Sequence, residues 1–155
     1  VYMRTSEFPN RILVPIAGGP NARLSLELAI TQADAIEQHT GNRPDVTALN
    51  LIKGISDEKC RNQRRRDLLR ELEIDRWSIE LRILPADDIV QGILRASAGF
   101  DQIVIGAPEE GVLEQTLFGS IPQRVAEKAS TTVVMVKHHH PVKYGLKRWF
   151  NRRTV

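Results

Sequence analysis

Five short apolar runs alternate along this chain with longer segments in which apolar residues recur at helical spacing. The runs that predict strands are residues 11–17, 46–52, 77–84, 102–105 and 131–136. The segments that predict helices are residues 22–40, 57–74, 87–98 and 120–130. Strict alternation of strands and helices predicts an α/β fold, a doubly wound five-stranded parallel sheet with helices on both faces. We expect the strand order 3-2-1-4-5, with right-handed crossovers.

Individual positions refine this pattern. The first helix is expected to begin after an Asn21 cap. Its apolar residues recur at helical spacing and are expected to face the core, namely Leu24, Leu28, Ala29, Ala35 and Ile36. The third strand (WSIELRIL) alternates apolar and polar residues, as an edge strand does. The last strand (TTVVMV) is rich in β-branched residues and comes at the other edge of the expected sheet.

The expected strand order reverses between the first and fourth strands, and doubly wound sheets bind ligands at such a point. The loops that meet there are residues 17–21 and 106–119, and both carry glycines. Gly119 directly precedes the fourth predicted helix, which begins at Ser120. Glycine lets backbone N–H groups approach a phosphate, and a helix N-terminus adds free donors, so an anion cradle is one interpretation. A plain turn followed by a helix cap is the other.

Composition places the chain among ordinary globular domains. It has 155 residues, of which 41% are hydrophobic and 26% charged, which fits one domain. No apolar run approaches the length of a membrane span, and no secretory signal is visible. The single cysteine, Cys60, excludes an internal disulfide and favours a reducing, cytoplasmic location. Because the chain begins with Val1, we expect a piece of a longer protein or a processed chain.

Charge is concentrated at the C-terminus. Residues 137–155 contain six basic and no acidic residues, which leaves 16 basic and 19 acidic residues, a net −3, in the rest. As a helix, this tail would place on one side Val142, Leu146, Trp149 and Phe150. Such a helix suits an anionic membrane surface, contacted through residues 141–153, or packs its apolar side on this domain or a partner.

Other chemical signals are weaker. The triplet from His138 to His140 fits a polar strand end better than a metal site, and we expect no metal. The arginine-rich stretch of residues 59–66 has no interleaved aromatic residues, so we expect a solvated face and no nucleic acid. Ser120 has no nearby base in the sequence and lies in no nucleophile elbow, so catalysis is not supported.

Three stretches together resemble the universal stress protein family. RILVPIAGGPNARLSLELA is similar to the family's opening strand and helix, and DQIVIGAP to its fourth strand. GAPEEGVLEQTLFGSIPQRVAEKASTTVVMVK is similar to the family's glycine-patterned loop, helix and last strand. The likeness runs from about Asn10 to Lys137. We therefore expect a leader at residues 1–10, the family domain at 11–137 and a basic amphipathic tail at 138–155.

The resemblance implies an ATP-type site with two departures. Gly106, Gly119 and Ser120 match the family's glycine pattern, but Glu109 stands at the middle glycine. Ala17 stands where the family has an acidic residue. The candidate site comprises Ile16, Ala17, Gly18, Gly106, Ala107, Glu109, Gly119, Ser120 and Ile121. The ligand would be ATP or another adenine nucleotide, and the two departures favour the alternative of no ligand.

Three functions follow from these patterns. The first is a non-catalytic regulatory domain that senses an adenine nucleotide and, in family terms, regulates a larger transporter or channel at the inner face of the membrane. The second is a ligand-free dimerisation module, and the third, which lacks a nucleophile and base, is a phosphate-hydrolysing enzyme. We also expect a homodimer through the edge strand between Thr131 and Val136, because that edge would otherwise expose unpaired backbone groups.

Overall fold

The β-branched runs pair as a five-stranded parallel sheet in a computed structural model that describes residues 8–54, 57–107 and 121–137. The strands are β1 (Arg11–Pro15), β2 (Asp45–Ile52), β3 (Glu80–Pro85), β4 (Gln102–Gly106) and β5 (Thr132–Val136). The helices are α1 (Gly19–Thr40), α2 (Glu58–Leu72), α3 (Ile89–Ala96) and α4 (Ile121–Lys128). The order β3-β2-β1-β4-β5 confirms the predicted doubly wound topology.

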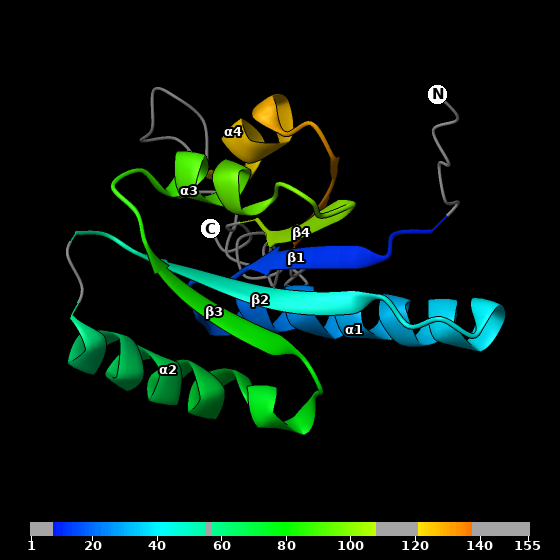
Figure 1. Ribbon diagram of the computed structural model, residues 1–155, viewed down its shortest axis with the longest axis horizontal. Helices are drawn as coiled ribbons and strands as arrows, with labels where there is room; N and C mark the ends of the chain where they lie inside the picture. The colour runs from blue at the N-terminus through cyan, green and yellow to red at the C-terminus, as the bar shows by residue number, and fades with distance from the viewer. Residues whose placement is uncertain (1–7, 55–56, 108–120, 138–155) are drawn as a thin grey trace, which may run out of the picture.

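Helices cover both faces of the sheet, with α1 and α2 on one side and α3 and α4 on the other (Figure 1). Alternate residues of β1 divide between the two cores. Ile12 and Val14 pack toward α1 and α2, whereas Leu13 packs with Phe100 and Val125 on the other face. All three β1 residues are completely buried, as expected for a central parallel strand.

The first helix differs from the prediction in its start and in its inner face. It begins at Gly19, so Gly18 is the N-cap and Asn21 lies in the first turn rather than at the cap. Ala29 and Ile36 are buried as expected, but Leu28 is 41% exposed and Ala35 is also exposed. The inner face combines further large apolar residues with small ones, which are Leu26, Ile30, Ala22, Ser25 and Ala33. Small side chains let the helix lie close to the sheet, and a pattern based on hydrophobicity overlooks them.

The third strand begins later than predicted. Glu73 adopts a left-handed conformation (φ 51°) that ends α2, and Ile74–Arg76 then form a 3-10 turn closed by the bond from the Trp77 N–H to the Ile74 carbonyl. The chain therefore pairs with β2 only from Glu80. The position of β3 at a sheet edge was predicted correctly.

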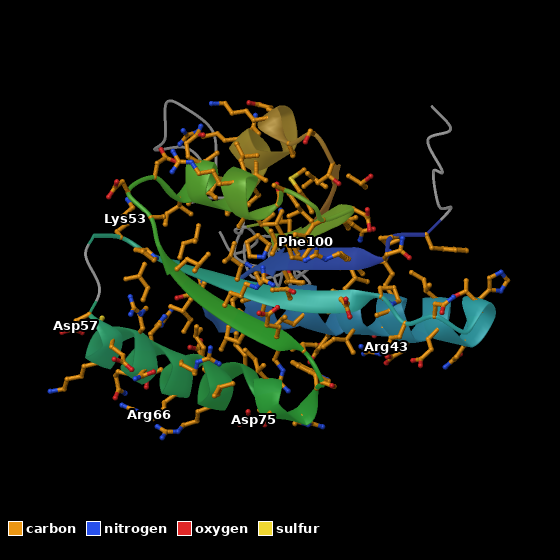
Figure 2. All side chains as sticks on the ribbon, viewed as in Figure 1. Arg43, Lys53, Asp57, Arg66, Asp75 and Phe100 are labelled. Atoms are coloured by element: carbon orange, nitrogen blue, oxygen red, sulfur yellow. The ribbon has the colours of Figure 1, made fainter. Side chains whose placement is uncertain are left out.

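The arginine-rich helix α2 has a solvent side and a sheet side. Arg66 lies on the side of α2 that faces away from the sheet (Figure 2). Arg65 instead donates to the Leu81 carbonyl of β3 at 2.8 Å. Part of the basic stretch thus holds the fold together.

Candidate functional site

The site lies where the chain leaves neighbouring strands toward opposite faces of the sheet. From β1 it passes to α1 on one face, while α4, which follows β4 in the described chain, covers the other (Figure 1). A cavity of about 410 Å³ lies at the carboxyl ends of β1, β2 and β4. Its position is the switch point at which α/β sheets bind ligands.

Two glycines form the β1–α1 turn on one side of this cavity. Gly18 has φ 106° and Gly19 has φ 81°, a region that side-chain-bearing residues rarely adopt. The Gly19 N–H donates to Glu71 Oε1 on α2 at 2.6 Å. Since α1 has no side-chain cap of its own, this carboxylate supplies the negative charge that a helix N-terminus favours.

A second contact with α2 holds the end of β1. Arg64 Nη2 donates to the Ala17 carbonyl at 2.5 Å, and Arg64 Nε donates to Asn50 Oδ1 at 3.3 Å. The buried Asn50 in turn donates from Nδ2 to the Ile16 carbonyl at 2.7 Å. These bonds fix the backbone of residues 16 and 17, which is part of the cavity wall.

Gly106 brings the end of β4 against the first turn of α1. A Cβ at this position would lie 2.9 Å from the Asn21 carbonyl oxygen. Any side chain would therefore force the two segments apart. Gly106 and Asn21 both line the cavity, so this close approach shapes its floor.

The remaining walls are mostly apolar. They come from β2, from the first half of α3 and from the first turn of α4, through Leu49, Leu51, Ile89, Ile93, Ile121 and Pro122. Ile121 is 43% exposed at α4's start. Among the described residues that line the cavity, Asn21 is the one with a polar side chain. Such a wall suits a flat apolar or aromatic group, with polar contacts supplied by backbone atoms.

Besides Glu71 and Arg64 of α2, helices α3 and α4 carry charges near this end of the sheet. Asp88 caps α3 by accepting the Gln91 N–H at 2.9 Å, and this bond lowers the pKa of the Asp88 carboxyl below its usual value. Arg124 of α4, 4.0 Å away, lowers the pKa further. The pair links the two helices whose first turns form a wall of the cavity.

The structure brings together five of the nine candidate residues. Lining the cavity are Ile16, Ala17, Gly18, Gly106 and Ile121. Ala107 lies just outside this set, and its N–H donates to the Val136 carbonyl of β5 at 2.7 Å. Glu109, Gly119 and Ser120 lie outside the described residues, as does the histidine triplet.

Sequence reasoning missed the walls from β2 and α3. Leu49 and Leu51 occur in a predicted strand, and Ile89 and Ile93 in a predicted helix, so only their place at the carboxyl edge would have marked them. Glu71 and Arg64 gave no signal, because their partners lie 52 and 47 residues away in the chain.

The described ranges contain neither a cluster of metal ligands nor a membrane-spanning helix. Within residues 8–54, 57–107 and 121–137, no group of three or more His, Cys, Asp and Glu residues could hold a metal ion. None of the helices in these ranges is long and apolar enough to cross a bilayer.

Comparison with known proteins gives a family model and a set of similar folds. The model of the universal stress protein family matches residues 9–137. No curated protein matches the chain significantly. Among solved structures, universal stress protein UspA from Lactobacillus plantarum aligns with a TM-score of 0.60 at 16% identity, over 82% of this chain and 97% of its own.

Two other similar structures were solved with nucleotides. A universal stress protein in complex with cAMP aligns with a TM-score of 0.59 at 16% identity, covering 83% of this chain and 97% of the other. The universal stress protein from Archaeoglobus fulgidus in complex with dAMP aligns with a TM-score of 0.56 at 18% identity, covering 82% and 97%. At these identities the similarity shows a common fold.

Proposed function

Since the chain belongs to the universal stress protein family, we propose that it is a non-catalytic regulatory domain that binds an adenine nucleotide in the switch-point cavity. The observation that carries this proposal is the 410 Å³ apolar cavity at the carboxyl ends of β1, β2 and β4. Its volume lies within the range of about 300–1,000 Å³ that is typical of small-molecule sites. The cAMP and dAMP bound by two proteins of the same fold support the choice of ligand.

The walls suit an adenine ring. Leu49 and Leu51 of β2 and Ile89 and Ile93 of α3 present apolar surface to a planar base. The turn at Ala17 and Gly18 offers backbone groups at the same edge, where they can fix the orientation of a base or ribose. Burial of the base would supply most of the binding energy, as apolar pockets generally do.

We place the phosphates near the start of α4. This helix begins at Ile121, directly after Gly119 and Ser120, and its first N–H groups and positive dipole end favour an anion. Glu109 is expected to oppose the charge. Replacing Glu109 with Gly should therefore tighten ATP binding about fivefold, the effect of roughly 1 kcal/mol of like-charge repulsion near a solvated surface.

We expect the described lining residues to bind a ligand rather than to catalyse a reaction. Their side chains include no carboxylate, imidazole, thiol or amine, so this part of the wall offers no general acid, general base or nucleophile. Regulation of a larger transporter stays a prediction, as does a cytoplasmic location. The free, exposed Cys60 fits a reducing compartment.

Calorimetry with a blocked cavity tests the proposal. Ala17 is exposed and lines the cavity, so Ala17→Trp fills the entrance without entering the core. We expect it to abolish AMP and ATP binding. Ala98→Trp, at an exposed alanine beyond the far end of α3, should bind as the wild type does. Equal binding by both variants, or none by the wild type, would contradict the proposal.

A second candidate function, a dimerisation module, is favoured by β5. Among the described residues this strand pairs with β4 alone and is an edge of the sheet, and its Met135 is 54% exposed. An open, apolar strand edge invites pairing with another strand. We propose that two copies associate along the edge between Thr131 and Val136, whether or not a nucleotide is bound.

A further inference from the structure

An apolar corner lies between helix α1 and strand β5. Its members are Leu24, Leu28 and Ala35 of α1 together with Val134 and Val136 of β5. Leu28 is 41% exposed, Ala35 is exposed, and the other three are half-buried. We refer to these five residues as the α1–β5 corner.

The contacts of α1 show that its exposed apolar residues lie toward β5. Asn21 packs against Gly106, and Gln32 exchanges amide hydrogen bonds with Gln102, so these two positions lie over β4. At about 100° per residue, Leu24, Leu28 and Ala35 follow next around the helix, beyond the row over β4.

The opposite flank of α1 faces elsewhere. There Arg23 bonds to Glu73 at the end of α2, and Asp34 pairs with Arg43 before β2. The apolar flank is therefore the one turned toward β5, on the face where Val134 and Val136 pack against the α1-side core.

The layer of helices on this face is incomplete. In it α2 lies beyond α1 toward β3, to which Arg65 bonds (Figure 1). In the described part of the chain, no helix lies on the other side of α1 over β5. A two-sided sheet normally covers the apolar face of each strand, so the corner lacks one covering element.

The chain itself supplies an element of suitable length at this place. Val136 pairs with Gly106, which lies against the first turn of α1. Residues that follow Lys137 therefore begin beside the end of α1 that carries Leu24. A helix over residues 141–153 would be about 20 Å long, and the stretch from Leu24 to Ala35 spans about 17 Å.

We propose that residues 141–153 dock as a helix on the α1–β5 corner. The helix would run in the same direction as α1. Its apolar side would pack on the corner, through Val142, Leu146, Trp149 and Phe150. Its basic residues would remain in solvent. A second copy paired along the β5 edge lies in the plane of the sheet, so both contacts can coexist. A membrane-bound tail would leave the corner exposed.

Tryptophan fluorescence of the full chain tests this docking. The chain has two tryptophans, and Trp77→Phe leaves Trp149 as the reporter. We expect blue-shifted emission and weak quenching by acrylamide at every protein concentration, without lipid. Adding Leu28→Asp should shift the emission to the red and raise the quenching constant severalfold. Ala126→Asp, at an exposed site on α4, should change neither.

Each alternative gives a different result. Quenching as strong as that of a free tryptophan derivative would overturn the proposal. So would protection that appears only at high protein concentration, which indicates a second copy, or only with vesicles containing phosphatidylserine, which indicates a membrane. Circular dichroism checks that Leu28→Asp keeps the native helix content. If it does not, the emission and quenching of the Trp77→Phe chain, in which the α1–β5 corner is intact, still test the docking.

Discussion

At the scale of single residues, the candidate site depends on groups that are far apart in sequence. Glu71 completes the N-terminus of α1 by accepting the Gly19 N–H, and it also lies against Gly18, where a Cβ would meet its carboxylate at 3.0 Å. Gly18 and Gly19 thus allow the tight turn, and Gly18 also lets the Glu71 side chain of α2 approach the backbone closely. This arrangement shapes the cavity wall formed by residues 16–18.

Removing the Glu71 carboxylate should therefore weaken the fold at this turn. We expect Glu71→Ala to lower the free energy of unfolding by about 1 kcal/mol, the usual effect of losing a helix cap. Glu71→Gln, which keeps an acceptor oxygen, should lose less. Urea denaturation measures both, and two variants as stable as the wild type would show that the bond contributes nothing.

At the scale of helices and strands, the hydrophobic pattern predicted the five strands and four helices, because buried parallel strands and amphipathic helices have distinct periods. The expected strand order is confirmed. The pattern did not predict the 3-10 turn of Ile74–Arg76. It misplaced the inner face of α1, where Ala22, Ser25 and Leu26 rather than Leu28 face the core. It also missed the cavity walls from β2 and α3, since these residues become neighbours only through the topology.

The cap of α3 gives a pH-dependent prediction at this scale. The pKa of Asp88 is lowered chiefly by the Gln91 N–H, so its charged form stabilises α3 at neutral pH. That contribution is present above the ordinary pKa of an aspartate and is lost as the pH falls through the lowered value. Asp88→Ala should be less stable than the wild type at pH 7, and this difference in stability should narrow as the pH falls below 3.8, the ordinary value for an aspartate. A gap that stays constant in urea titrations would refute this cause.

The two edge strands allow a matched test of dimerisation. Met135 on β5 is 54% exposed and Leu84 on β3 is 42% exposed. We expect Met135→Lys to weaken the dimer about tenfold, through lost apolar contact and repulsion between like charges. Leu84→Lys should leave the dimer unchanged. Sedimentation velocity at micromolar concentration would contradict the assignment if the wild type is a monomer or if Leu84→Lys disrupts the dimer instead.

At the scale of the whole molecule, the two ends of the sheet differ in chemistry. The carboxyl ends of β1, β2 and β4 border the apolar cavity. The amino ends border a smaller, polar hollow of about 310 Å³ that contains Arg11 and Arg82, and Arg82 is paired with Glu80. An aromatic base is therefore expected at the carboxyl end, where apolar surface is available, rather than among these ion pairs.

Nuclear magnetic resonance with added AMP tests this account most directly, because it reports both binding and its place. The account predicts that the backbone amides of Gly18, Gly106 and Ile121 shift as AMP is added, while those of Asp45 and Asp101 at the other end of the sheet stay still. Absence of shifts with millimolar AMP and ATP, or shifts confined to Asp45 and Asp101, would contradict it.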